Sequence, residues 1–202
     1  MKILIICEKF PPDIGGLATS GFRISSRFVD LGNDVHVLAW TRQLAPGTVD
    51  SKEINGMKFH RMGRFSNWDL TMQHSLNFLD WLNDRVDFDV VWGHYLQVAG
   101  FMAVMFGRRS KIKSVVSARG NDVDQMMFPP GDFSRLKWVL EMADFVTSVS
   151  AELSEKIKMI IGDDCTVHVI PNAVDPDIFY PDEPEPEIRK VEQLLPACDI
   201  IK

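Results

Sequence analysis

The chain has 202 residues, enough for one large domain or for one domain with an appendage. Hydrophobic residues make up 46% and charged residues 25%, a globular composition that excludes general disorder. The formal net charge of −6 argues against a nucleic-acid-binding surface over the whole chain. Three cysteines without a CxxC motif predict neither a disulfide framework nor a zinc site, and indicate a cytoplasmic protein. No apolar run approaches the length of a membrane span, so peripheral membrane association is the most that we expect.

Short apolar runs alternate with stretches of helical periodicity along the chain. The predicted strands are continuous and apolar, and they cover residues 2–7, 34–40, 57–62, 88–92, 113–118, 145–149 and 167–170. The predicted helices lie between them, at residues 17–31, 67–85, 96–106, 133–142 and 151–161. Ser150 is a favourable N-cap for the last helix. This alternation predicts an α/β fold, a Rossmann-like parallel sheet with helices on both faces.

The composition changes near the C-terminus. Residues 176–202 begin with prolines interleaved with acidic residues, a composition typical of an extended linker, and end in a short tail. We therefore expect one Rossmann-like domain over residues 1–175, followed by an acidic, proline-rich linker and tail over residues 176–202.

Candidate functional residues follow from the position of the strands. In an open parallel sheet, ligands bind at the carboxyl ends of the strands. The polar and glycine residues that follow predicted strands are Asp13, Gly15, Gly16, Thr41, Arg42, His94, Arg119, Gly120, Asn121, Asp122, Ser150 and Asn172. We expect these residues to gather at one edge of the sheet.

Gly15 and Gly16 lie between a predicted strand and the start of a helix. Adjacent glycines let backbone N–H groups approach an anion, which the helix dipole also favours. A tight turn without a ligand is the alternative. The motifs GxGxxG and GxxxxGK[ST] are absent, which weakens a dinucleotide-binding or P-loop interpretation.

Arg119 follows a predicted strand and could clamp a phosphate or carboxylate. Its alternative role is to pair with Asp122 or Asp124 and hold the loop. For these two aspartates, solvated loop charge is favoured over contact with a sugar hydroxyl or a cation.

His94 could hydrogen-bond a ligand or shuttle a proton, or it could cap the next helix. His36 and His60 sit inside predicted strands, which indicates a structural role. No group of His, Cys, Asp or Glu residues has zinc-ligand spacing, so no protein-bound metal is expected.

Four stretches carry a resemblance to a known family. They are residues 11–16 with 31–37, residues 89–94, residues 116–122, and residues 143–150 with 169–181. In this order they resemble the N-terminal half of retaining glycosyltransferases of family 4, which have the GT-B fold. The chain has Asn33, Trp92 and Arg119 where the family pattern has histidine.

The resemblance implies sugar transfer with retention, from a nucleotide-sugar to a carbohydrate or lipid acceptor, without a metal cofactor. It places Gly15 and Gly16 in the loop that faces the donor diphosphate and the acceptor. Donor-binding roles are also expected for Asp13, Asn121, Asp122, Ser150 and Asn172. His94 and Arg119 are the catalytic candidates, and Arg119 would act electrostatically because arginine stays protonated.

In the family, a C-terminal domain holds the nucleotide. We expect that domain to be absent from this chain, which would then be inactive without it or without a partner chain. The apolar residues 126–128 suggest an exposed face and a homodimer.

The alternatives to a glycosyltransferase domain are a non-catalytic interaction domain with the same fold and a nicotinamide-dependent oxidoreductase. Residues 40–42 lack the acidic residue that such an oxidoreductase would need there.

Overall fold

The structure is a computed structural model, and it describes residues 1–174. The chain divides into two compact units, Met1–Pro171 and Asn172–Lys202. The expected linker and tail over residues 176–202 lie outside the described residues. All the helices and strands below belong to the first unit.

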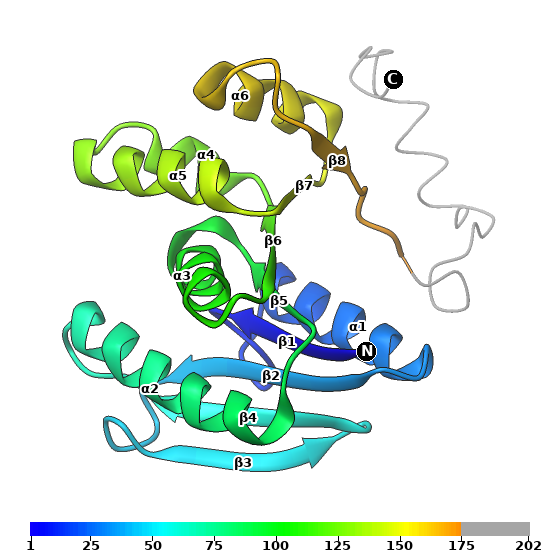
Figure 1. Ribbon diagram of the computed structural model, residues 1–202, viewed down its shortest axis with the longest axis vertical. Coiled ribbons are helices and arrows are strands. Elements are labelled where there is room, and N and C mark those ends of the chain that lie inside the picture. The colour runs from blue at the N-terminus through cyan, green and yellow to red at the C-terminus, as the bar shows by residue number, and fades with distance from the viewer. Residues whose placement is uncertain (175–202) are drawn as a thin grey trace, which may run out of the picture. The chain divides into compact units, whose positions relative to one another are not determined.

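The first unit contains an eight-stranded sheet in the order β3-β4-β2-β1-β5-β6-β7-β8 (Figure 1). The strands are β1 (Lys2–Cys7), β2 (Asp34–Thr41), β3 (Val49–Ile54), β4 (Met57–Gly63), β5 (Val90–His94), β6 (Lys113–Ala118), β7 (Phe145–Ser148) and β8 (Val167–Val169). Every pairing is parallel except that of β3 with β4. This confirms the predicted Rossmann-like α/β fold.

The antiparallel edge strand β3 was not predicted, so the expectation of a wholly parallel sheet is wrong at this edge. The four central residues of β3 are exposed, and an edge strand of this kind shows no apolar run. A tight turn joins β3 to β4 through Asn55 (φ 48°) and Gly56 (φ 75°). Two successive residues with positive φ are what a two-residue hairpin requires.

The helices are α1 (Gly16–Asp30), α2 (Trp68–Val86), α3 (Phe101–Ser110), α4 (Asn121–Met126), α5 (Pro130–Met142) and α6 (Ala151–Ile161). Ser150 caps α6 as predicted, because its Oγ accepts the N–H of Leu153 at 3.2 Å. The predicted helix over residues 96–106 begins instead as a π-helical turn, η1 (Leu96–Gly100), and continues as α3. The short helix α4 replaces a predicted loop.

Strand β1 shows why helices cover both faces of the sheet. Ile3 and Ile5 pack in a cluster with residues of α1, whereas Leu4 and Ile6 pack in a cluster with residues of α2 and α3. These four side chains are at most 5% exposed, and each contributes roughly 1.5–3 kcal/mol by its burial. Within residues 1–174, no helix is long and apolar enough to cross a bilayer.

The strand order reverses at β1, which pairs with β2 on one side and with β5 on the other. The connections from β1 and from β5 therefore leave the sheet in opposite directions. Such a reversal opens a crevice beyond the carboxyl ends of the two strands. Glu8 follows β1 and Tyr95 follows β5 at this point.

A buried histidine pair joins β2 to β4. Nδ1 of His36 lies 3.0 Å from Nε2 of His60, and Oγ of Ser51 lies 2.8 Å from Nδ1 of His60. Burial lowers the pKa of both imidazoles to about 4, so both are neutral at pH 7. The pair has the structural role that the sequence indicates.

We predict that the free energy of unfolding falls as the pH is lowered from 7 to 5. The unfolded chain protonates these histidines near pH 6.5, whereas the folded chain keeps them neutral down to about pH 4. Protons therefore bind preferentially to the unfolded state in this window, at a cost of roughly 2 kcal/mol per histidine at pH 5.

Urea titrations at the two pH values measure this loss. A His60→Gln variant should lose less stability between pH 7 and pH 5 than the parent chain. The control His168→Gln changes an exposed histidine and should behave like the parent. An unchanged pH dependence in His60→Gln would contradict the prediction.

Candidate functional site

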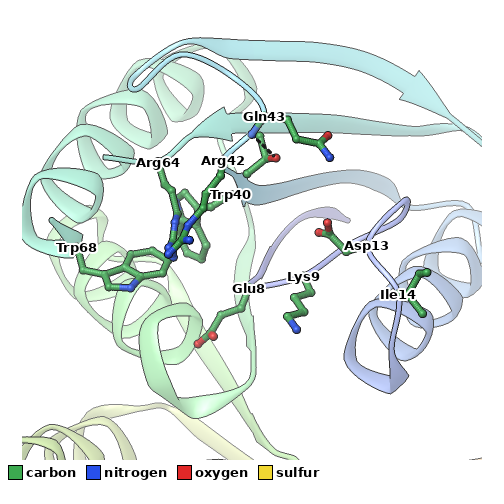
Figure 2. A pocket seen from close by; sticks show the side chains of 10 residues that line it. Glu8, Lys9, Asp13, Ile14, Trp40, Arg42, Gln43, Arg64 and Trp68 are labelled. Atoms are coloured by element: carbon green, nitrogen blue, oxygen red, sulfur yellow. Dashed lines mark hydrogen bonds between the residues drawn. The ribbon is translucent and has the colours of Figure 1, made fainter. Parts of the chain in front are cut away.

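A cleft of about 470 Å³ lies at the carboxyl ends of β1, β2 and β4 (Figure 2). Its lining is mostly charged and aromatic, and consists of Glu8, Lys9, Asp13, Ile14, Trp40, Thr41, Arg42, Gln43, Arg64 and Trp68. The volume is in the range of small-ligand sites. Of the residues selected from the sequence, Asp13, Thr41 and Arg42 line this cleft.

Glu8 is the carboxylate at the reversal of the strand order, and it also lines the cleft. Its Oε1 accepts the N–H of Val98 at 2.9 Å, which ties the end of β1 to η1. Burial raises the pKa of Glu8, and the negative charge of Asp122 adds to this. A carboxylate in this position can accept hydrogen bonds from the hydroxyl groups of a ligand.

Asp13 anchors the loop between β1 and α1. Its Oδ2 lies 3.5 Å from Nη2 of Arg61, a buried arginine on β4. The same Nη2 donates to the carbonyl oxygens of Phe10 at 2.8 Å and Pro11 at 3.2 Å. Arg61 therefore holds this loop against the sheet, and Asp13 lies at the cleft with part of its charge compensated.

Gly15 is the N-cap of α1 and adopts φ 133° and ψ 165°, a conformation that favours glycine. Within residues 1–174, no side chain caps this helix end. A Cβ at Gly15 or Gly16 would meet no described atom within 4 Å, so the backbone here is open to approach. The N–H groups of the first turn, with the helix dipole, suit a phosphate group.

Asp122 is fully buried, so the interpretation as solvated loop charge is wrong. The backbone N–H groups of Leu96, Arg119 and Gly120 donate to its two oxygens over 2.8 to 3.1 Å. Burial raises the pKa of Asp122 above its usual value, and these hydrogen bonds offset only part of that rise. The carboxylate joins the connection after β5 to the loop after β6, and so holds these two segments together.

Arg119 directly follows β6 and is half-buried. Its backbone N–H, held by Asp122, fixes where the side chain leaves the sheet. The next residue, Gly120, has φ 122° and is the N-cap of α4, and Asn121 is the exposed first residue of that helix. Arg119 thus carries a positive charge at the same edge of the sheet as Gly15.

His94 is the last residue of β5 and is 1% exposed. Its Nε2 lies 2.9 Å from Oγ of Ser20 on α1. Burial, together with the positive charge of Arg119, lowers the pKa of His94 to about 3. The buried ring is therefore neutral at pH 7, and its contact with Ser20 joins β5 to α1.

Tyr95 has a strained backbone, with φ 115° and ψ 146°. A non-glycine residue in this conformation costs about 1–3 kcal/mol, and such strain concentrates at functional sites. Burial raises the pKa of its hydroxyl to about 12, and the carboxylates of Asp122 and Glu8 act in the same direction. Tyr95, Glu8 and Asp122 therefore form one electrostatically coupled group at the crevice.

Two further candidates are placed differently. Ser150 uses its Oγ as the cap of α6, so that oxygen is engaged by the backbone. Asn172 is the first residue of the second unit, and it is exposed.

Sequence reasoning missed Glu8, Arg64, Trp68 and Tyr95. Glu8 and Arg64 directly follow β1 and β4, so the strand-end rule that selected Arg42 could have found them. The strain at Tyr95 has no signal in the sequence. Trp68 begins α2, and only its contact with the cleft distinguishes it from a core aromatic residue.

Comparison with known proteins identifies a family. The sequence model of Glycosyltransferase Family 4 matches residues 14–178, which is most of the chain. No curated protein matches the sequence.

Solved structures share the fold at low sequence identity. Sucrose-phosphate synthase from Thermosynechococcus elongatus matches with a TM-score of 0.71 at 13% identity, over 96% of this chain and 53% of that one. HepE from Anabaena, in complex with UDP and glucose, matches with a TM-score of 0.65 at 14% identity, over 96% and 50%. A UDP-N-acetylglucosamine 2-epimerase matches with a TM-score of 0.56 at 13% identity, over 84% and 47%. This chain spans about half the length of these proteins.

We predict that Asp122→Asn destabilises the fold by about 2–4 kcal/mol, because an amide N–H₂ would then face backbone N–H donors. Urea titration measures the difference. The control Asp124→Asn changes an exposed aspartate that pairs with Lys156, and should cost less than about 1 kcal/mol. Equal losses in both variants would show that Asp122 does not join the two loops.

Proposed function

The chain belongs to Glycosyltransferase Family 4, and on this premise we propose that it transfers a sugar from a nucleotide-sugar to an acceptor hydroxyl. We propose that transfer retains the anomeric configuration, and that this chain forms the acceptor-side domain. HepE, which shares the fold, is described in complexes with UDP and with UDP-glucose. Those complexes support a nucleotide-sugar as the donor.

One observation carries the proposal: an open helix N-terminus and a polar cleft lie at the same edge of the sheet. Negative charge develops on the leaving diphosphate during transfer, and preorganised N–H groups and cations stabilise it. The first turn of α1 at Gly15 and the charge of Arg119 would serve this end. The cleft beside them would hold the acceptor, with Glu8 accepting hydrogen bonds from its hydroxyl groups.

We propose that a C-terminal domain binds the nucleotide and completes the site. The related chains, about half of which this chain covers, support this. The 202-residue chain would then bind ligands weakly and turn over little donor by itself. A nicotinamide-dependent oxidoreductase is not proposed, because Arg42 follows β2 where an acidic residue would bind the ribose.

We predict that the chain, extended by the C-terminal half of a family 4 enzyme, transfers sugar, and that Gly15→Ala lowers its turnover roughly tenfold or more. A Cβ at φ 133° would force the first turn of α1 away from the diphosphate. Release of UDP from UDP-glucose and UDP-N-acetylglucosamine, with a panel of acceptors, measures turnover.

The control is Gly131→Ala, at an open helical glycine of α5 without positive φ. It should leave turnover unchanged. Strong transfer by the unextended chain would refute the need for a second domain. Absence of transfer by every extended form would favour a non-catalytic interaction domain.

We also propose that transfer needs no metal ion, because side chains and N–H groups of the protein supply the positive potential. Turnover by the extended chain should be the same with excess EDTA as with added Mg²⁺. A loss of activity in EDTA that Mg²⁺ or Mn²⁺ restores would contradict this.

A further inference from the structure

We propose that the acceptor is an anionic sugar, whose carboxylate or phosphate group binds between Arg42 and Arg64 in the cleft. The inference rests on the proposed function in taking the ligand of this cleft to be the acceptor. It goes beyond that function by giving the acceptor a charge and a direction of binding.

The strand register brings the two arginines together. Thr41 and Gly63 are partners at the ends of the parallel strands β2 and β4. The N–H of Arg64 donates to the carbonyl oxygen of Thr41 at 2.9 Å, so the pairing continues one residue beyond the strands. Arg42 and Arg64 therefore leave neighbouring strands at the same level, and Figure 2 shows both side chains extending into the cleft.

The charges of these two arginines have no carboxylate partner among residues 1–174. Arg61, on the same strand end as Arg64, differs in being buried and paired with Asp13. Arg61 thus serves the fold, whereas Arg42 and Arg64 present positive charge to whatever enters the cleft. Guanidinium groups bind carboxylate and phosphate oxygens through paired, charge-assisted hydrogen bonds.

An aromatic surface holds Arg64 in place. Its guanidinium carbon lies 5.0 Å from the ring centroid of Trp68, a cation–π distance. Trp68 packs edge-on against Trp40 with ring centroids 5.6 Å apart, and Nε1 of Trp40 donates to Oγ of Ser75 at 2.8 Å. Because the side chain of Arg64 is already held in place, it loses less conformational entropy when it binds an anion.

The carboxylates of Glu8 and Asp13 also line the cleft, away from the two arginines, and Figure 2 shows Lys9 between them. Carboxylates accept hydrogen bonds from hydroxyl groups and repel anions. A ligand with an anionic group at the two arginines and hydroxyl groups that reach Glu8 or Asp13 matches this lining. A sugar acid or a sugar phosphate has this form, and the cleft of about 470 Å³ has room for it.

A second hollow supports the same location for the anion. Arg42 and Arg64 also line a neighbouring space of about 410 Å³, together with Leu44, Pro46, Phe65 and Ser66. The two guanidinium groups thus border both hollows. An acceptor longer than one sugar could place its anionic residue at the arginines and continue into this second space.

The test measures binding of three sugars to the 202-residue chain by NMR titration: glucuronate, glucose 6-phosphate and neutral glucose. We expect at least one anionic sugar to bind roughly tenfold more tightly than glucose, and added salt to reduce that preference. Arg42→Gln and Arg64→Gln should each remove most of the preference. Arg64→Lys should restore part of it, because the charge remains while the paired geometry is lost.

The control Arg108→Gln changes an exposed arginine near the end of α3, at the opposite edge of the sheet, and should leave the preference unchanged. Thermal melts establish that each variant is folded. Equal binding of the three sugars, failure of every anionic sugar to bind, or a preference that survives both arginine variants would overturn the proposal. Inorganic phosphate that binds as tightly as glucose 6-phosphate would overturn the assignment to a sugar.

This experiment involves neither donor nor turnover, so its outcome is separate from that of the proposed function. A charge preference could be found in a chain that transfers nothing. Transfer to neutral acceptors alone by the extended chain would leave the family activity intact and refute the anionic acceptor.

Discussion

One buried carboxylate holds together the two connections that follow β5 and β6. Asp122 receives hydrogen bonds from Leu96, after β5, and from Arg119 and Gly120, after β6. Oriented N–H groups stabilise its charge where water is excluded, so the two connections cannot separate without leaving an unpaired anion. This single interaction fixes both the strained Tyr95 and the exit of Arg119 from the sheet.

The edge of the sheet separates charges that hold the fold from charges that face a ligand. Arg61 is buried and binds Asp13 and two carbonyl oxygens, so it closes the loop that leads to Gly15. Arg42 and Arg64 directly follow the neighbouring strands β2 and β4, and they line open space. The difference comes from position along the strand, because residues within the sheet meet other side chains and residues beyond it meet solvent.

Much of this could be predicted from the sequence, and the failures have physical causes. The strand-end rule selected Gly15, Arg42 and Arg119, and the structure puts all three at the carboxyl edge of the sheet. The same rule passed over Glu8 and Arg64. Asp122 was misinterpreted because an aspartate in a polar segment looks the same whether it faces water or backbone N–H groups. For His94, the sequence could not show that the ring is buried and therefore neutral at pH 7.

The sequence by itself determined the alternation of the buried strands with the longer helices, and the motifs of the family, because apolar periodicity and short motifs are local properties of the chain. The exposed strand β3 and the short helix α4 were not predicted. The tertiary structure decided which polar residues meet. Residues 42 and 64 become neighbours through the parallel register of β2 and β4, and residues 96 and 122 through the packing of η1 against α4. The tertiary structure also shifted the protonation equilibria of Glu8, His94 and Asp122, because their pKa values respond to burial among residues far away in the sequence.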